Sequence, residues 1–482
     1  MEKGLERVMY KQQIKEYIEA HKQEMLEDIA TLCRINSEKM AYKVGMPFGE
    51  GTFRALGAAL SMAEKYGFAT TNYDSYVGTV DFGALERHLD ILAHVDVVPA
   101  GEGWTVTEPF EPLVKDGKIY GRGTADDKGP AVAALYAMRC VKDLGIPLKK
   151  NVRLILGTDE ECGSADIAHY YDVEPEAPMT FSPDASYPVV NIEKGRFPGH
   201  FTAEWEESQA LPKLVSLEAG IKENVVPGKA FATIELGNKT LEDIRPVIAQ
   251  AEKEFDMEFV LTAQDSLEDD PIYTITAIGA GAHASTPEAG KNALTALLTL
   301  VSRLPLADCP QAEYVKKLVK LFPHGDVNGK ALGIDMKDDL SGEMTVAFSM
   351  LKIDEGSLDG TFDSRCPICS TEENTLEAVR KLMAENGITL LNKSMTPPHH
   401  VDGNSDFVKT LLKAYEEYTG RKGECLAIGG GTYVHHLKNG VAFGAAMPET
   451  ENRMHGADEF AVIDELVASA EIFAQVIIDL CA

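Results

Sequence analysis

Two adjacent carboxylates, Asp126 and Asp127, lie in the glycine-rich stretch GRGTADDKGP at residues 121–130. Like charges this close disfavour each other's ionisation, so either water screens them or a cation binds beside them. A helix N-cap, in which one carboxylate accepts backbone N–H groups, is a third interpretation. Phosphate binding is disfavoured, because the stretch lacks Gly-Lys followed by Ser or Thr and its acids would repel a phosphate.

Other acidic and histidine residues share one position in the sequence pattern, directly after a predicted strand. They are His94 with Asp96, Glu160 with Glu161, and Asp184. In an open α/β sheet the carboxyl ends of parallel strands meet at one edge, where ligands bind. We therefore expect these residues to lie beside Asp126, and so much negative charge is unfavourable without cations. Each residue alone fits a structural role, such as a solvated acidic loop, but together they predict a metal site.

The elements that would position these residues alternate between buried strands and helices. The runs LDILAH, VRLILG and MTFS are predicted as strands, and helices are predicted over residues 11–35, after Pro130 and at the C-terminus. This alternation is typical of βαβ units and a mainly parallel sheet. From about residue 192, ATIELG, YTITAIG and MTVAFSML alternate as exposed antiparallel strands do. We predict an α/β catalytic domain from residues 1–191 and 396–482, interrupted by an α+β lid domain at 192–395.

The composition disfavours several classes of protein. A net charge of −30, from 76 acids and 46 bases, argues against a nucleic-acid partner, which requires a basic face. The first 25 residues are charged throughout and lack the apolar core of a signal peptide. No apolar run approaches the roughly 18 residues of a membrane span. Eight scattered cysteines fit free thiols in a reducing compartment, so we expect a cytoplasmic protein that does not bind membranes.

The only C-x-x-C motif is CPIC, in which Cys366 and Cys369 are the two thiols. A zinc ribbon needs a second such pair, which the sequence lacks. A redox motif should follow a strand and open a helix, and the acidic run STEENTLEAV that follows is compatible with a helix. Thiol-redox chemistry therefore remains a minor alternative, which predicts activity that survives chelation and is lost on alkylation.

Six motifs occur in a fixed order between residues 94 and 459: HVDVVP, GRGTADDKGP, TDEECGS, SPDASYP, GAGAHAS and ETENRMHGADE. In these motifs the chain resembles the cocatalytic-zinc metallopeptidases that include carboxypeptidase G, aminoacylase and succinyl-diaminopimelate desuccinylase. Within that family it is most similar to the dipeptidase V type, the carnosinase-like Xaa-His dipeptidases. Each motif alone is moderately specific, whereas six in order are highly specific.

The resemblance implies a ligand set for two divalent metal ions. His94 and Asp184 would bind one ion, Glu161 and His455 would bind the other, and Asp126 would bridge both. One imidazole and carboxylate oxygens for each ion suit Zn²⁺, and Mn²⁺ or Co²⁺ are also compatible.

The resemblance also implies three catalytic residues. Glu160 would be the general base that takes a proton from the metal-bridging water and passes it to the leaving amine. Asp96 would orient the His94 imidazole or a nearby group. His283, in the predicted lid domain, would stabilise the oxyanion of the tetrahedral intermediate. Without the resemblance, His283 would be interpreted as a histidine in a polar loop before a helix.

Substrate contacts are implied at two further places. Asn224 and Arg365 of the lid domain would bind substrate, with Arg365 suited to a terminal carboxylate, although a solvated loop arginine is the alternative. In the stretch AIGGGTYVHH at 427–436, the backbone N–H groups of Gly430, Gly431 and Thr432 would meet a carboxylate. The dipeptidase V type tends to carry a basic residue soon after this tyrosine. This chain instead has Val434, His435 and His436, and we interpret the two histidines as a surface pair.

These implications together predict a metal-dependent hydrolase that cleaves the amide bond of dipeptides, whose lid would exclude longer peptides. The alternatives are a deacylase of N-acyl amino acids with the same metal chemistry, and a catalytically silent binding protein. A silent protein should have lost a ligand or the base, whereas all the matching residues are present. An enlarged lid that supplies His283 within the same chain predicts a monomer.

Overall fold

The computed structural model describes residues 2–264 and 272–482 and divides into two compact units. Unit 1 comprises residues 1–193 and 400–482, and unit 2 comprises Lys194–His399. The boundaries expected from sequence, after residues 191 and 395, differ from these by two and four residues respectively. Each unit has its own sheet and its own hydrophobic core.

Unit 1 is built on a nine-stranded mixed sheet. Its strands in spatial order are β1 (Ala69–Tyr73), β2 (Val77–Asp81), β6 (Asn151–Gly157), β3 (Arg87–His94), β7 (Met179–Ser182), β25 (Gly440–Ala442), β9 (Val189–Glu193) and β23 (His399–His400), with β24 (Cys425–Ile428) paired to β9. β6, β3, β7 and β25 run parallel in the centre, while β1 and β2 form an antiparallel edge. The centre therefore has the expected parallel βαβ arrangement.

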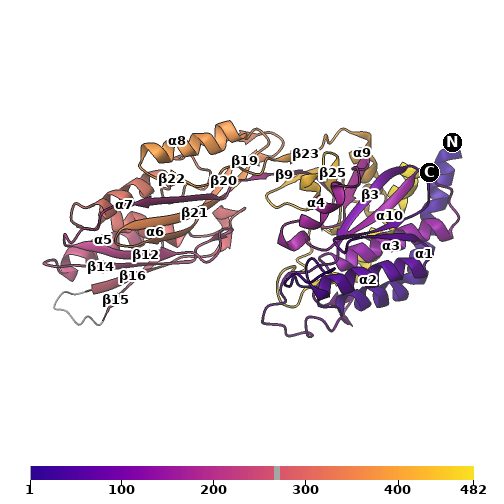
Figure 1. Ribbon diagram of the computed structural model, residues 1–482, viewed down its shortest axis with the longest axis horizontal. Helices are drawn as coiled ribbons and strands as arrows, with labels where there is room; N and C mark the ends of the chain where they lie inside the picture. Colours follow the sequence, from indigo (N-terminus) through magenta and orange to yellow (C-terminus); the bar gives the residue numbers. More distant parts are fainter. Residues whose placement is uncertain (1, 265–271) are drawn as a thin grey trace. The chain divides into compact units, whose positions relative to one another are not determined.

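Alternation along β3 separates the two faces of this sheet. Leu89, Ile91 and Ala93 point into the main core, whereas Leu92 belongs to a smaller cluster on the opposite face. The main core is covered by α1 (Glu2–Cys33), α2 (Glu50–Lys65), α3 (Lys128–Asp143), α9 (Asp406–Thr419) and α10 (Ile463–Cys481) (Figure 1). The smaller cluster is covered by α4 (Ala165–Tyr171). His94 falls on the same side of the strand as Leu92.

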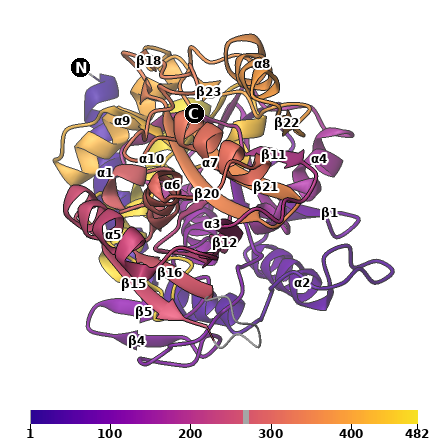
Figure 2. The same cartoon turned by 90° about the vertical axis from the view of Figure 1, so that its left-hand side faces the viewer.

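Unit 2 is an α+β unit whose nine-stranded sheet pairs antiparallel throughout. Its strands in spatial order are β15 (Glu258–Ala263), β16 (Ile272–Ile278), β14 (Lys229–Glu235), β12 (Lys213–Ala219), β20 (Thr345–Ile353), β21 (Ser357–Cys366), β11 (Gly199–Glu204) and β22 (Thr389–Leu390), with β10 (Gly195–Arg196) on β21. The helices α5 (Leu241–Phe255), α6 (Ala293–Arg303), α7 (Pro310–Leu321) and α8 (Ala378–Glu385) share one core with the sheet (Figure 2). Along β14, Ala230, Ala232 and Ile234 are buried while Phe231 is exposed, so one face of this strand is covered.

Short elements complete the two units. Unit 1 also contains β4 (Leu113–Lys115), β5 (Lys118–Tyr120), β8 (Ala185–Ser186), β26 (Ala445–Ala446), β27 (Phe460–Val462) and the 3₁₀ turns Glu160–Cys162 and Tyr433–His436. Unit 2 contains β13 (Val225–Val226), β17 (Ala282–His283), β18 (Lys337–Asp338), β19 (Gly342–Glu343), the 3₁₀ turn Pro287–Ala289 and a π-helical turn at Glu372–Glu377. No helix in the described ranges is long and apolar enough to cross a membrane.

Candidate metal centre

The parallel strands of unit 1 bring the predicted metal ligands to one edge of the sheet. His94 is the last residue of β3 and lies opposite Gly157, the last residue of β6. β7, which ends at Ser182, pairs with the other side of β3. The segments that follow β6 and β7 carry Glu160, Glu161 and Asp184, so all three emerge beside His94. The pairing of β27 with β5 in a separate three-stranded sheet holds the C-terminal segment near the loop before Asp126, and His455 of that segment contacts Asp126.

Asp126 lies between two imidazoles and contacts each with a different oxygen. Its Oδ1 is 3.0 Å from His94 Nε2, and its Oδ2 is 2.8 Å from His455 Nε2. On the first side, Asp184 Oδ2 is 3.7 Å from His94 Nε2. On the second side, Glu161 Oε1 is 3.3 Å from His455 Nε2. One carboxylate flanked by two imidazole–carboxylate pairs is the geometry of a bridging ligand between two centres.

The ligand atoms converge closely enough to bind ions. One oxygen each from Asp126 and Glu161 and a nitrogen of His94 all lie within 4.8 Å of one another. The same holds for His94 with Glu160 and Asp184. Glu160 therefore reaches the first centre, and its position is compatible with either a base or a ligand. Glu161 Oε1 is buried and lies 3.3 Å from His455 Nε2, as suits two ligand atoms of one centre.

The electrostatics of the cluster are those of an acidic site that requires positive charge. Burial, and then the neighbouring Asp126 carboxylate, raise the pKa of Asp184 to about 7. Burial and Asp184 raise the pKa of Glu160 well above its usual value. Hydrogen bonds to Asp126 and Glu161 raise the pKa of His455 to about 10. In the absence of cations, these clustered carboxylates bind protons more readily than usual, because a proton reduces their mutual repulsion. Two divalent cations would neutralise the same negative charge, so the donor set fits two such ions.

Asp96 links the His94 imidazole to the turn that carries the two glutamates. Its Oδ1 accepts the backbone N–H of Glu160 at 3.2 Å, and its Oδ2 accepts that of Glu161 at 3.1 Å. The same Oδ1 is 3.3 Å from His94 Nδ1. Asp96 is almost completely buried, so these contacts form away from water. One carboxylate therefore fixes the relative positions of three residues of the site.

Asp127 differs from its neighbour Asp126, which answers the question that the pair of carboxylates raised. Asp127 is fully buried, and its Oδ2 accepts the backbone N–H of His94 at 3.1 Å. It precedes α3, but its side chain makes no N-cap hydrogen bond, so the N-cap interpretation is wrong for Asp127. Lys128 is also buried, and its Nζ donates to the carbonyls of Leu32 and Ile35 near the end of α1.

A buried carboxylate from the C-terminal segment shapes the loop before Asp126. Glu459 Oε1 accepts the backbone N–H groups of Gly123, Ala125 and Asp126, and Glu459 Oε2 pairs with the buried Arg122 guanidinium. Three convergent N–H donors on one oxygen hold this loop in a single conformation.

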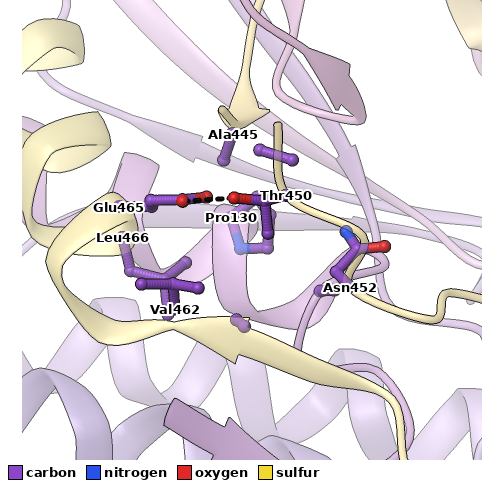
Figure 3. Close-up of a pocket in the computed structure, with 10 residues that line it drawn as sticks. Pro130, Ala445, Thr450, Asn452, Val462, Glu465 and Leu466 are labelled. Atoms are coloured by element: carbon purple, nitrogen blue, oxygen red, sulfur yellow. Dashed lines mark hydrogen bonds between the residues drawn. The ribbon is translucent and has the colours of Figure 1, made fainter. Parts of the chain in front are cut away.

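Behind the loop lies a cavity of about 20 Å³, lined by Pro130, Leu466 and other residues, among which Thr450 donates a hydrogen bond to Glu465 (Figure 3). Its volume is that of about one water molecule. The cavity is far too small for a dipeptide and belongs to the support of the loop.

Two of the unit 2 residues expected to contact substrate, Asn224 and His283, lie on or beside one pair of short strands. β13 pairs with β17, placing His283 opposite Val225, and Asn224 accepts the N–H of Ala284 through its carbonyl. His283 Nδ1 accepts the backbone N–H of Ser285 at 3.2 Å, so the neutral ring carries its hydrogen on Nε2. Burial and the nearby Arg365 charge lower the pKa of His283, which favours this neutral form.

Arg365 is not a solvated loop arginine. It lies on β21, is only 7% exposed, and donates from Nε and Nη2 to Asp363 Oδ2. A guanidinium held by a buried carboxylate on a strand has a fixed direction, as a residue that binds an anion requires.

The glycine-rich stretch at 427–436 is anchored by two buried carboxylates. Glu193 accepts both the backbone N–H and the hydroxyl of Thr432, and Asp166 accepts the hydroxyl of Tyr433. The N–H of Thr432 thus meets a carboxylate of the protein itself. His435 Nδ1 lies 3.0 Å from Glu193, so the interpretation of His435 as part of a surface pair is wrong, whereas His436 is exposed.

The CPIC cysteines have different environments and form no disulfide. Cys366 is buried on β21, and burial raises the pKa of its thiol to about 12, the opposite of what a reactive thiolate requires. Cys369 is exposed.

Sequence reasoning missed several residues that hold the site together. They are Lys39, Asp166, Glu193 and Glu459. Each makes its contact across a large sequence separation or in a turn. Glu459 lies at the end of the motif ETENRMHGADE, but the sequence does not indicate its role, and the other three lie outside the six motifs. A buried charge next to a predicted site residue is the only signal that could have suggested them.

An imidazole–carboxylate cluster with a shared aspartate at the strand ends of an α/β sheet defines a candidate dinuclear metal site of the kind used by two-metal hydrolases. The chain belongs to peptidase family M20/M25/M40, which its residues 91–479 match.

Similar proteins agree with this assignment. The chain is 36% identical over 473 residues to the Beta-Ala-Xaa dipeptidase of Lactobacillus delbrueckii subsp. lactis, covering 97% of this chain and 98% of the relative. It is 36% identical over 466 residues to the putative dipeptidase YtjP of Bacillus subtilis, covering 95% and 97%. Human carnosine dipeptidase 1 has the same fold, with a TM-score of 0.58 at 14% identity over 98% of each chain. The aminoacylhistidine dipeptidase of Vibrio alginolyticus has a TM-score of 0.58 at 14% identity, over 95% of this chain and 96% of that one.

Proposed function

We propose that this chain is a dipeptidase that hydrolyses the amide bond of dipeptides at a dinuclear metal centre, most readily with Zn²⁺. The observation that carries the proposal is Asp126, whose two oxygens face His94 and His455 separately. Relatives named as dipeptidases, similar over nearly the whole chain, support the substrate class. His94, Asp126 and Asp184 would hold one ion, and His455, Asp126 and Glu161 the other. Imidazole and carboxylate ligands suit zinc and also accept manganese or cobalt.

In this proposal the protein's own residues orient the reactants and move the proton. When bound, two divalent cations polarise the scissile carbonyl and lower the pKa of the attacking water. Glu160 takes the proton from that water and delivers it to the leaving amine. Asp96 holds the backbone of Glu160 and Glu161 in place, so the base and the ligand keep a fixed separation. Nucleophilic attack therefore needs no rearrangement of the turn.

For unit 2 we propose that His283, Asn224 and Arg365 act on the substrate. The ring nitrogen Nε2 of His283 carries a hydrogen and is therefore a donor suited to an oxyanion. Arg365 would bind the terminal carboxylate of the dipeptide, since its planar guanidinium can donate two parallel hydrogen bonds. Gly430 and Gly431 would supply further N–H donors. The Thr432 N–H would act on substrate only if Glu193 released it, because Glu193 accepts it in the structure.

We also propose that the enzyme is a monomer and that it is cytoplasmic. Within one chain, β12 pairs with β20 to make the sheet of unit 2 continuous, so this sheet needs no second copy to complete it. Eight unpaired thiols suit a reducing compartment. Sedimentation at micromolar concentration should give a single species of about 52 kDa, and a stable dimer would contradict a monomer.

The test of function is a substrate panel on metal-stripped protein, before and after addition of Zn²⁺, Mn²⁺ or Co²⁺. The panel contains β-Ala-His, Ala-Ala, Ala-Ala-Ala and N-acetyl-alanine. Metal-dependent cleavage of the dipeptides alone supports a dipeptidase. Cleavage of N-acetyl-alanine alone would replace it with a deacylase that uses the same centre. Two bound ions without turnover of any substrate would replace it with a binding protein.

A further inference from the structure

The turn Glu160–Cys162 carries both glutamates of the proposed mechanism, so its conformation decides where the base and a ligand lie. The carboxylates of two buried aspartates hold the start of the turn. Asp96 accepts the N–H groups of Glu160 and Glu161, and Asp166 Oδ2 accepts that of Asp159 at 2.9 Å. All these hydrogen bonds use backbone donors at or before Glu161. At the far end, the N–H groups of Cys162 and Ser164 donate to the carbonyl of Asp159 at 3.3 and 2.8 Å, but none of these contacts uses the carbonyl of Cys162, the last residue of the turn.

Lys39 contacts both ends of this turn with one ammonium group. Its Nζ lies 2.6 Å from Oδ1 of Asp159, the residue directly before the turn. The same Nζ donates to the carbonyl of Cys162, the last residue of the turn, at 3.2 Å. Lys39 comes from the segment between α1 and α2, more than a hundred residues away in sequence. An ion pair on one side and a hydrogen bond on the other bracket Glu160 and Glu161 between them.

The burial of Asp159 makes this contact stronger than an ordinary ion pair between two exposed side chains. The Asp159 side chain is only 1% exposed, whereas that of Lys39 is 37% exposed and lies 5.1 Å from the ring centroid of Phe48. The only other donor to the Asp159 carboxylate among the described residues is the N–H of Ala165, which contacts Oδ2 at 3.2 Å. Removing the ammonium would leave a buried carboxylate with a single neutral donor, which is costly. The turn would then move to bring that carboxylate to water.

We infer that Lys39 is a positioning residue for the catalytic turn. Its contacts with Asp159 and Cys162 hold the turn in one conformation. Glu160 and Glu161 thereby keep their places at the metal centre. This inference rests on the proposed function and deepens it. It predicts that loss of the ammonium weakens metal binding and turnover together, without unfolding the protein.

The test compares Lys39→Met, Lys39→Arg and the control Lys43→Met. Lys43 lies in the same segment, but its side chain is 61% exposed, and its one ion pair within the described part of the chain is with the exposed Glu50, at 3.2 Å. Co²⁺ is titrated into each metal-free protein and followed by its visible absorption band. The turnover number on β-Ala-His and the melting temperature are measured on the same preparations.

Loss of a residue that positions metal ligands typically costs 10- to 100-fold in metal affinity or activity. We expect Lys39→Met to lower the Co²⁺ affinity and kcat by roughly these factors and to change the Co²⁺ band. Lys39→Arg should restore most of both, since it can make the same two contacts. Lys43→Met should behave as the parent protein. All three variants should melt within a few degrees of the parent.

Two results would overturn the inference. One is a Lys39→Met protein whose Co²⁺ binding, spectrum and kcat equal those of Lys43→Met. The other is a Lys39→Met protein with a much lower melting temperature that Lys39→Arg does not restore, which would make Lys39 a general stabilising residue. If the parent protein hydrolyses no dipeptide, the proposed function fails, while the Co²⁺ titration still decides the role of Lys39.

Discussion

Replacing Glu160 with Gln separates the two roles that its position allows. Glu160 lies with His94 and Asp184 in a group whose ligand atoms are within 4.8 Å, so it is near enough to bind an ion as well as to act as a base. The amide keeps the shape of the side chain but cannot accept a proton at neutral pH. Loss of a general base lowers kcat by roughly 10²–10⁴-fold, or about 3–5 kcal/mol of transition-state stabilisation.

The expected metal content follows from counting the ligands that remain. Without Glu160, the first centre keeps His94, Asp126 and Asp184, and the second centre keeps its own imidazole and both its carboxylates. Glu160→Gln should therefore retain two ions. Glu161→Gln, the matched control one residue further on, removes a carboxylate ligand and should retain about one ion after gel filtration.

The assay combines metal analysis with kcat on β-Ala-His for the parent and both variants. A Glu160→Gln protein with two ions and kcat lowered at least 100-fold would support the base. A Glu160→Gln protein that keeps only one ion would show that the roles of Glu160 and Glu161 have been exchanged. A kcat within 10-fold of the parent with both ions bound would refute a catalytic role for Glu160 altogether.

Three further outcomes are expected. His283→Ala should lower kcat by roughly 10²–10³-fold with both ions retained, because it removes an oxyanion donor; an unchanged kcat on β-Ala-His would contradict this. Chelation should abolish hydrolysis and lower the melting temperature, since the clustered carboxylates then repel one another, and Zn²⁺ at 1,000 times its Kd should restore about 4 kcal/mol of stability in a denaturant titration. Glu471 on α10 has a pKa raised from 4.5 to about 7, mainly by burial, with Lys15 4.0 Å away partly opposing the shift. Because the raised pKa favours the protonated folded state, stability is lost as pH rises from about 4.5 to about 7. Glu471→Gln should therefore gain about 3 kcal/mol of unfolding free energy at pH 8.5 and about 1 kcal/mol at pH 5, and an equal gain at both would disprove the assignment.

The residues after the strands could be predicted because a local pattern carries them. A buried apolar run such as LDILAH ends at His94, and parallel pairing then determines which side chains are neighbours. The helices that follow Pro130 and close the chain were likewise predictable, because their apolar residues recur at helical spacing. The periodicity of apolar residues relates neighbouring positions in the sequence, so it predicts single strands and helices and nothing larger.

Other parts of the site depend on contacts that no local pattern encodes. His455 has a positive φ of 62° in an irregular segment, and it was predicted only from the resemblance. The interactions of Lys39 with Asp159 and of Glu193 with Thr432 each join segments more than a hundred residues apart. Adjacent acids also cannot be told apart from sequence, since Asp127 supports the end of β3 while Asp126 faces the two imidazoles.

The position of residues 400–482 after unit 2 affects when the proposed metal centre can form during synthesis on the ribosome. Unit 2 is a single stretch, Lys194–His399, so all of it emerges before residues 400–482 are made. Unit 1 needs that last segment, because β25 lies between β7 and β9 in its sheet and α10 packs on α3. The same segment supplies His455, the second imidazole beside Asp126. A nascent chain that ends within unit 2 therefore carries the proposed carboxylate ligands Asp126, Glu161 and Asp184, but it cannot complete the centre until the segment with His455 has also been made.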